Sequence, residues 1–195
     1  MGTADSVDEA FRAVPRARFL PRLSRPRARH DVPILIGHGQ TNSQPRTVAD
    51  MLRLLQVEPG QRVLDVGSGS GWTTALLAHL TGPTGEVVGV ELEPDLVRWG
   101  AANLASVRMP WARIQQPRPG VLGDPDHAPW DRILVSAEAT ALPQALVDQL
   151  GEPGRLVVPV SGSMTLVVRA GGVVTTSTHG RYRFVPLREV PGAPG

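Results

Sequence analysis

The residues of this chain best suited to chemistry lie in two glycine-rich segments. The first, Gly37 to Pro45, carries the hydroxyl of Ser43 among other polar side chains. The second, Val63 to Gly71, begins with a valine- and leucine-rich run that contains Asp65 and ends with glycines at three alternate positions. Residues 72–78 then show helical apolar spacing, so the second segment is predicted to form a strand, a tight turn and a helix start.

The glycine turn predicts a cofactor site. Glycine permits positive φ and lets a ligand lie against the main chain, and the following helix start offers free N–H groups. Gly67, Gly69 and Gly71 give the pattern G-x-G-x-G, and Trp72 occupies the position that a dinucleotide fingerprint fills with Gly or Ala. This departure favours S-adenosylmethionine, whose amino acid end needs no pyrophosphate cradle, over NAD.

A second predicted strand supplies another acid. Residues 86–91 form a valine-rich run that ends at Glu91, 26 residues after Asp65. An acid at such a strand end can accept hydrogen bonds from both hydroxyls of a ribose. The alternative is an ordinary glycine turn and strand-end acid in an unrelated α/β domain.

Length and composition indicate one soluble enzyme domain. The chain has 195 residues, 41% of them hydrophobic, which suffices for one buried core but not for two typical domains. No apolar run approaches the roughly 18 residues of a membrane helix, and Asp5, Asp8 and Glu9 lie where a signal peptide would be basic and apolar. We therefore expect a cytoplasmic protein that is a monomer. Cysteine is absent and the five histidines lack ligand spacing, so no metal site is predicted.

The charged residues suggest two readings of the N-terminal region. All 20 basic residues are arginine and the net charge is only +2, so the pI of about 10.3 reflects a lack of groups titrating near neutral pH rather than strong basicity. Six arginines do cluster between Arg16 and Arg29, as a nucleic-acid site would require. However, Phe19 is the one aromatic among them, and three prolines interrupt any basic helix. A solvated arm without nucleic-acid binding is the favoured interpretation.

The alternation of elements predicts a Rossmann-like α/β fold, a doubly wound and mostly parallel sheet with helices on both faces and a C-terminal antiparallel hairpin. Residues 1–195 are expected to form a single domain of this fold, in which residues 1–60 make a helical and loop cap that carries Ser43. The proline at 186 makes the last run an expected edge strand. The predicted strands are 62–66, 86–91, 111–115, 131–136, 154–160, 166–169, 173–177 and 183–187, and the predicted helices are 5–14, 46–56, 72–78, 93–107 and 142–150.

The two glycine-rich segments together resemble the protein-L-isoaspartate O-methyltransferase family. This family uses S-adenosylmethionine to methylate the side carboxyl of damaged aspartyl residues. The resemblance covers roughly residues 9–189. Besides the two segments, it rests on the runs Ala10–Phe19, Ala128–Asp131, Gln149–Leu150, Gly154–Val160 and Phe184–Leu187.

The resemblance implies a role for each site residue. Ser43 corresponds to the active-site serine, which would bind the substrate carboxylate, and Arg46 is a candidate to offset its charge. Carboxylate attack on a sulfonium methyl needs positioning and desolvation more than a general base. The residues implied in cofactor binding are Gln40, Thr41, Asn42, Asp65, Gly67, Ser68, Gly69, Gly71, Glu91, Leu92 and Gly120.

Three departures from the family pattern leave alternatives open. Arg118-Pro119-Gly120 stands where the family has Gly-Asp-Gly, whose acid meets the adenine. Asn42 replaces an apolar residue, and Arg46 replaces an aromatic one. The expected function is methylation of isoaspartyl residues in proteins or peptides. The alternatives are a dedicated peptide-maturation or small-molecule methyltransferase, and a cofactor-binding homologue with little turnover.

Overall fold

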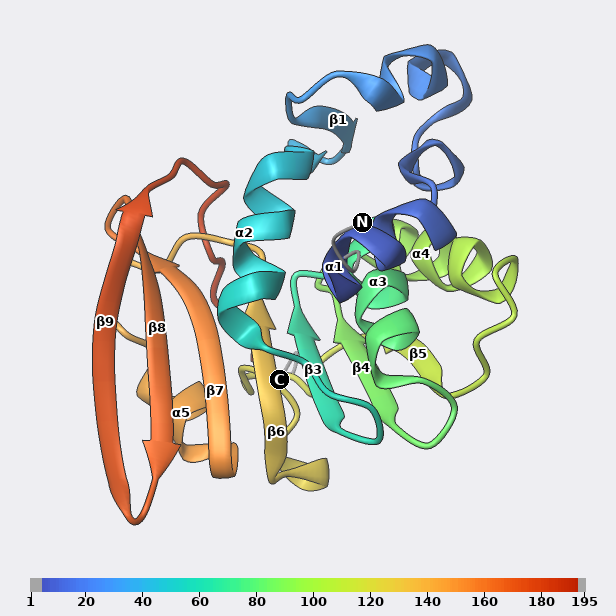
Figure 1. Ribbon diagram of the computed structural model, residues 1–195. Coiled ribbons are helices and arrows are strands. Elements are labelled where there is room, and N and C mark those ends of the chain that lie inside the picture. The colour runs from blue at the N-terminus through green and yellow to red at the C-terminus, as the bar shows by residue number, and fades with distance from the viewer. Residues whose placement is uncertain (1–4, 193–195) are drawn as a thin grey trace.

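The computed structural model describes residues 5–192 and contains a seven-stranded sheet flanked by helices (Figure 1). A separate two-stranded hairpin precedes the sheet in the chain. The elements in chain order are α1 (Ser6–Ala13), η1 (Arg16–Phe19), η2 (Arg22–Arg29), β1 (Ile34–Gly37), β2 (Gln40–Asn42), α2 (Pro45–Leu55), β3 (Arg62–Val66), α3 (Trp72–Thr81), β4 (Glu86–Val90), α4 (Pro94–Ala105), β5 (Ala112–Gln115), η3 (Pro125–His127), β6 (Trp130–Val135), α5 (Gln144–Asp148), β7 (Leu150–Val160), β8 (Ser163–Ala170) and β9 (Val173–Arg181).

The strand order is β5-β4-β3-β6-β7-β8-β9. The first five of these strands run parallel, whereas β8 and β9 form an antiparallel hairpin against β7. The predicted fold class is therefore confirmed. Strands β4 and β5 are added on one side of β3, and β6 and the later strands on its other side. The strand order therefore reverses between β3 and β6, and ligands bind at this switch point in such sheets.

The sheet is buried between two apolar layers. One face packs against α1, α2, α3 and α4, and most residues of α3 are buried. The other face is covered by the short helix α5 (Figure 1). Loop residues such as Leu122 and Leu187 also pack against this face. Helices thus lie on both faces, although one face has a single short helix.

Prolines begin α2 and α4, and a residue with a left-handed backbone ends α2. Pro45 and Pro94 occupy the first turns of α2 and α4, where a missing N–H costs nothing. Asp31 accepts a hydrogen bond from the backbone N–H of Arg46 at 2.9 Å, and this satisfies one free donor at the start of α2. Gln56 ends α2 with a left-handed backbone (φ 53°).

The prediction of an edge strand at 183–187 is wrong. The edge of the sheet is β9, and the chain after it crosses over the carboxyl end of β6. There Glu138 donates its N–H to Val185 O at 2.8 Å, and Leu187 donates its N–H to Glu138 O at 2.7 Å. These two bonds hold the segment as a wall above the sheet instead of as part of it.

Other predicted boundaries change near residue 150. The helix predicted for 142–150 is limited to Gln144–Asp148, because Pro143 precedes it and Leu150 already pairs with Trp130. Strand β7 consequently begins four residues earlier than predicted, at Leu150 rather than Gly154. The hairpin of β1 and β2 and the 3-10 segments were not predicted.

Candidate functional site

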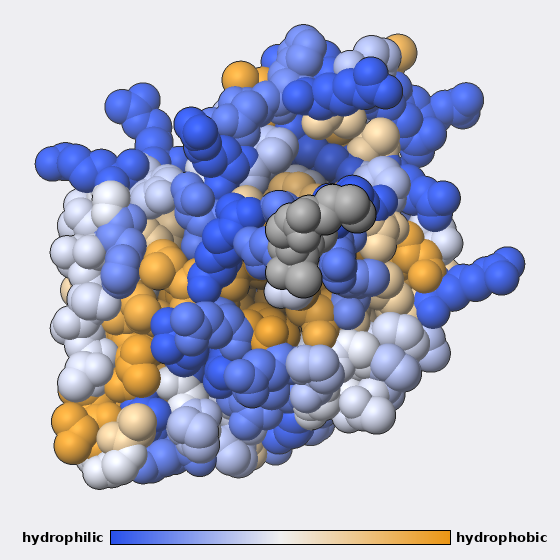
Figure 2. Space-filling view, in the orientation of Figure 1, coloured by the Kyte–Doolittle hydropathy of each residue, from blue (hydrophilic) through white to orange (hydrophobic). Residues whose placement is uncertain are grey.

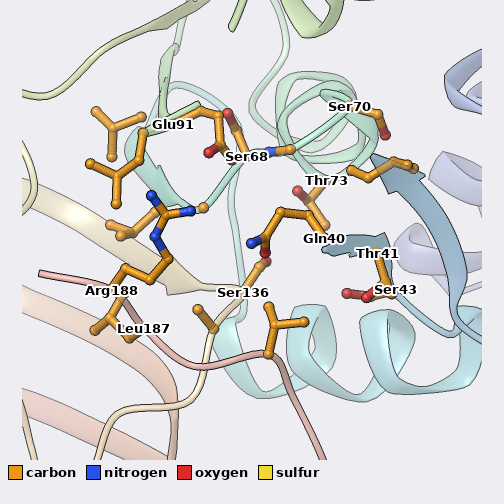
Figure 3. Close-up of a pocket in the computed structure, with 18 of the residues that line it drawn as sticks. Gln40, Thr41, Ser43, Ser68, Ser70, Thr73, Glu91, Ser136, Leu187 and Arg188 are labelled. Atoms are coloured by element: carbon orange, nitrogen blue, oxygen red, sulfur yellow. Dashed lines mark hydrogen bonds between the residues drawn. The ribbon is translucent and has the colours of Figure 1, made fainter. Parts of the chain in front are cut away.

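One pocket opens at the carboxyl ends of β3, β4 and β6, the switch point of the sheet (Figure 3). The β1–β2 hairpin forms its opposite wall, and the C-terminal segment closes a third side. The lining residues are Ile36, Gln40, Thr41, Asn42, Ser43, Val66, Gly67, Ser68, Gly69, Ser70, Trp72, Thr73, Val90, Glu91, Leu92, Pro117, Leu122, Gly123, Ser136, Ala137, Val185, Pro186, Leu187, Arg188 and Val190.

The glycine turn between β3 and α3 forms the floor of this pocket. Gly67, Gly69 and Gly71 all have positive φ (80°, 52° and 85°), which side chains rarely adopt. Gly67 and Ser68 donate their N–H groups to Val90 O at 2.9 and 3.1 Å, so the turn is fixed to the end of β4. The main chain is thereby exposed to the pocket with no side chain in the way at the glycines.

Gly71 has a packing role as well. A Cβ atom at this position would lie 2.9 Å from Ile114 Cδ1 and 3.0 Å from Gly100 O. The close approach of the turn to α4 therefore requires glycine here, whatever ligand the pocket holds. Gly71 does not line the pocket.

Glu91 stands at the end of β4 with its carboxylate against the glycine turn. The side chain is 8% exposed, and it accepts hydrogen bonds from Gly69 N–H at 2.9 Å and Glu93 N–H at 3.0 Å. Two backbone donors hold the carboxylate in one place on the pocket wall. Each carboxylate oxygen retains a lone pair for a further donor.

Asp65 lies beneath the turn and is fully buried. Its Oδ2 accepts hydrogen bonds from the hydroxyls of Thr73 and Thr74 at 2.8 and 2.7 Å, while Oδ1 has no partner among the described residues. Burial raises the pKa of Asp65 to about 6, against the lowering effect of the two threonine hydroxyls. Ser68 Oγ is likewise buried without a partner in residues 5–192. Unpartnered buried polar atoms beside a pocket are typical of a site that binds a polar ligand.

Ser43 reaches the pocket from the segment that follows β2, opposite the glycine turn (Figure 3). Its backbone is held by Arg16, whose guanidinium donates to Ser43 O at 2.9 Å and to Asn42 O at 3.0 Å. The same guanidinium donates to the carbonyl oxygens of His30 and Val32 at 3.1 and 2.9 Å. Arg16 therefore sets the position of the Ser43 backbone, and it is a residue that the sequence analysis did not place in the site.

Arg16 and Asn42 connect the serine side of the pocket to the glycine turn. Arg16 Nε donates to Asn42 Oδ1 at 2.7 Å, and Asn42 Nδ2 donates to Ser70 Oγ at 3.1 Å. Arg16 also lies over the ring of Trp72, 5.4 Å from its centroid. The polar replacement at Asn42 thus makes a structural link, since its side chain is 5% exposed and its amide is occupied.

The C-terminal segment contributes residues that the sequence analysis missed. Val185 to Arg188 line the pocket, and Arg188 pairs with Glu93 at the start of α4. Ser136, at the end of β6, lines it too, and Gln40 points into the middle of the cavity (Figure 3). Ligands bind at the carboxyl ends of the strands in such sheets, which predicted Gly67 and Glu91. The same rule could have predicted Ser136, because it follows the carboxyl end of β6.

Most of the residues predicted for the site come together. The lining contains Gln40, Thr41, Asn42, Ser43, Gly67, Ser68, Gly69, Glu91 and Leu92, whereas Asp65, Gly71, Gly120 and Arg46 lie outside it. Arg46 is exposed on the first turn of α2. Gly120 donates its N–H to Pro191 O at 2.8 Å, which connects its loop to the C-terminal segment.

The donors and acceptors present fit S-adenosylmethionine. Gly67, Ser68 and Gly69 line the pocket and offer backbone groups to the amino acid end. The ammonium of that end requires hydrogen-bond acceptors, and Asp65 Oδ1 and Ser68 Oγ at the turn are buried oxygens without a partner in residues 5–192. Glu91 offers a carboxylate for ribose hydroxyls. Leu92, Pro117 and Leu122 give an apolar wall suited to a purine ring.

The parallel sheet, its switch-point pocket and this turn define a class I methyltransferase-type domain. A comparison with protein families matches residues 1–191 to the family described as Protein-L-isoaspartate(D-aspartate) O-methyltransferase (PCMT). The chain belongs to this family, as its motifs predicted.

Named relatives agree with this assignment. A Protein-L-isoaspartate O-methyltransferase of Methanocella arvoryzae is 42% identical over 177 residues, covering 89% of this chain and 94% of the relative. One of Anaeromyxobacter dehalogenans is 43% identical over 201 residues, covering 99% and 94%. Among solved structures, a candidate protein-L-isoaspartate O-methyltransferase of Plasmodium falciparum in complex with S-adenosyl-L-homocysteine superposes with a TM-score of 0.84 at 27% identity, covering 96% of this chain and 92% of that one.

Residues 5–192 show neither a helix that could span a membrane nor a cluster of metal-binding side chains. None of the helices there has the length and apolar character needed to cross a membrane. No group of three or more His, Asp or Glu side chains in the same residues could hold a metal ion.

Proposed function

We propose that this protein transfers the methyl group of S-adenosylmethionine to the side carboxyl of L-isoaspartyl residues in proteins or peptides. The observation that carries the proposal is one pocket with two chemically different walls. Ser43 lies on one wall, and the glycine turn with Glu91 lies on the other. Family membership supports the same substrate class.

The cofactor would bind along the wall formed by β3 and β4. Gly67 to Gly69 would contact its amino acid end, Glu91 would accept from the ribose, and Leu92 would contact the adenine. S-adenosylmethionine supplies a methyl group already activated on a sulfonium. With Pro119 in place of the family's acid, and Gly120 outside the pocket, we infer that the adenine is held by apolar contact rather than by an acid of that loop.

Ser43 would orient the substrate carboxylate. Its hydroxyl donates to one carboxylate oxygen, so that the other oxygen faces the methyl group for in-line displacement. The carboxylate forms the new oxygen–carbon bond as the sulfur–carbon bond breaks, and S-adenosylhomocysteine leaves with the bonding pair. No proton is transferred in this step, so the pocket needs no general base. Asp65 is too deeply buried to serve as one.

The role of Arg16 follows from its hydrogen bonds. Arg16 holds the carbonyl of Ser43 and the side-chain oxygen of Asn42 on the serine wall, and Asn42 in turn donates to Ser70 Oγ at the glycine turn, so that Arg16 positions one wall directly and is linked to the other through Asn42. We assign it as a positioning residue, since it touches neither reactant. Arg46 is exposed outside the lining and remains a proposed electrostatic contact for substrate.

Calorimetry followed by a transfer assay tests the function. We expect S-adenosylhomocysteine to bind and to raise the melting temperature by mass action, whereas NAD does neither. With S-adenosylmethionine, the protein should then methylate an isoaspartyl peptide. Binding without transfer to this peptide would point to a dedicated peptide-maturation or small-molecule enzyme, or to a binding homologue. A melting shift from NAD equal to that from S-adenosylhomocysteine would contradict the cofactor assignment.

The single-domain organisation, a monomeric state and a cytoplasmic location stay predictions. The cap of residues 1–60 shares its core with the sheet, because Val48 and Leu55 of α2 pack in one cluster with Val63 and Leu134. This sharing supports one folding unit. Size-exclusion chromatography with light scattering tests the monomer.

A further inference from the structure

The N-terminal region carries a dense group of unpaired arginines. We call residues 16–30 the arginine arm; it contains six arginines and no acid. Arg16 is buried, but the other five are exposed, and none of them lies within 4.0 Å of a carboxylate in residues 5–192. These five are Arg18, Arg22, Arg25, Arg27 and Arg29.

Some arginines in the rest of the chain are paired with acids. Arginines outside the arm that pair with Asp or Glu are Arg53, Arg62, Arg98, Arg113, Arg118 and Arg188. Arginines that pair with no carboxylate in residues 5–192 also occur elsewhere, such as Arg12, Arg46 and Arg108. The arm differs because five exposed arginines of this kind lie within 15 consecutive residues that contain no acid. Figure 2 shows hydrophilic side chains projecting from the upper part of the surface, where Figure 1 places the arm.

Apolar side chains are exposed beside these charges. Leu23, between two of the arginines, is 96% exposed, and Leu35 on the adjoining hairpin is 69% exposed. Phe19, the one aromatic residue of the arm, is fully buried. The arm thus presents guanidinium groups and aliphatic side chains, but no exposed Phe, Tyr or Trp ring on which a base could stack.

The end of the arm is attached directly to the substrate wall of the pocket. The guanidinium of Arg16 bonds His30 O at the end of the arm and Ser43 O in the pocket wall. Asp31, the next residue, accepts from the Gln44 side chain at 3.0 Å and from Arg46 N–H at 2.9 Å. A chain leaving the pocket beside Ser43 on this side would meet the arm first.

We propose that the arginine arm is a docking surface for acidic polypeptide segments that flank the residue to be methylated. The inference rests on the proposed function, because it takes the pocket beside Ser43 as the place of the substrate carboxylate. Long-range attraction between the arm and acidic residues would raise the association rate of such substrates and hold them near the pocket. Leu23 and Leu35 would contact their aliphatic parts.

The dimensions of the arm set the length of the segment. Helix η2 has eight residues, and at a rise of about 2 Å each it spans about 16 Å. An extended peptide covers that distance in about five residues. A docked segment of about five residues would therefore lie along η2.

The test uses two isoaspartyl peptides that differ only in their flanks, one with glutamates and one with glutamines. We expect the full chain to methylate the glutamate peptide with the higher kcat/KM at low salt, and the preference to disappear at high salt. The variant Arg22→Gln/Arg25→Gln/Arg27→Gln/Arg29→Gln should lose about 16-fold in kcat/KM on the glutamate peptide, since each of the four exposed contacts is worth about a factor of two. Its kcat/KM on the glutamine peptide should stay at the parent level.

Two controls separate the arm from other causes. Arg108→Gln removes one exposed charge that precedes β5, away from the pocket at the opposite strand ends, and should leave the preference unchanged. Activity on the glutamine peptide reports the fold and the proposed function, so its absence in the parent would refute the function and not the arm. Equal use of both peptides by the parent, or an equal loss on both in the arm variant, would overturn the docking proposal.

Competition identifies the class of partner. An acidic peptide without an isoaspartyl residue should inhibit methylation of the glutamate peptide and have no effect on the arm variant. The assignment to polypeptide would be overturned if a short DNA duplex or phosphatidylserine vesicles inhibited at a lower charge concentration than this peptide. The inhibition would have to be absent in the arm variant.

Discussion

Replacing Arg16 with lysine tests the buried arginine that joins the two walls of the pocket. The guanidinium donates five hydrogen bonds, to His30 O, Val32 O, Asn42 O, Asn42 Oδ1 and Ser43 O. Burial lowers the pKa of Arg16 to about 10, which leaves it charged at neutral pH. Lysine has three donors on one nitrogen, so at least two of the acceptors lose their partner.

The cost can be worked out from those two lost bonds. At about 1.5 kcal/mol for each bond from a charged donor, Arg16→Lys should lower the free energy of unfolding by about 3 kcal/mol. For a chain of 195 residues this corresponds to a fall of roughly 6 to 12 °C in melting temperature. Urea denaturation followed by circular dichroism gives the free energy directly.

Arg25→Lys is the matched control. Arg25 is exposed, and the bond it donates, to Leu20 O, is long at 3.5 Å, so the same substitution should change stability by less than about 0.5 kcal/mol. Equal effects of the two substitutions, or an Arg16→Lys variant as stable as the parent, would refute the argument that Arg16 holds the pocket walls together.

Three further substitutions test the glycine turn and its acids. Burial raises the pKa of Asp65 from 3.8 to about 6, so the carboxyl is protonated in the native state at a pH where the unfolded chain is already ionised. The parent should therefore lose about 3 kcal/mol of stability as pH rises from about 4 to 6, and Asp65→Asn should lose much less over the same range in urea titrations. The same loss in both proteins would contradict the raised pKa of Asp65. Glu91→Ala should weaken S-adenosylhomocysteine binding by about 1.5 to 3 kcal/mol in calorimetry, and unchanged affinity would remove Glu91 from the site. Gly71→Ala should destabilise by about 2 kcal/mol more than Gly39→Ala, because its Cβ would meet Ile114 Cδ1 at 2.9 Å whereas Gly39 faces open space; equal melting temperatures would refute the packing role.

The sequence predicted the parts of the site that depend on local pattern. Gly67, Gly69 and Glu91 follow valine-rich runs, and strand ends of a parallel sheet meet at one edge, so their placement follows from chain order alone. Ser43 could be placed by resemblance, since nothing in its local pattern distinguishes it from a polar loop residue.

Contacts between distant segments could not be predicted in this way. Arg16 belongs to a run of arginines that the sequence suggests is solvated, yet it is 5% exposed because its partners come from residues 30 to 43. Phe184 to Leu187 has the composition of a strand, but its partner is the loop at Glu138 and not the sheet edge. Composition and periodicity describe which residues prefer burial or extension, and they do not specify the partner.

The most direct test of the central claim compares Ser43→Ala with the parent on one peptide made with an isoaspartyl or a normal aspartyl residue. The parent should methylate the isoaspartyl form selectively. Ser43→Ala should lower that turnover by roughly tenfold to 150-fold at saturating cofactor, the equivalent of about 1.5 to 3 kcal/mol, with S-adenosylhomocysteine affinity unchanged. Equal methylation of both peptides by the parent, or unchanged turnover in Ser43→Ala, would contradict the claim that Ser43 positions an isoaspartyl carboxylate for methyl transfer.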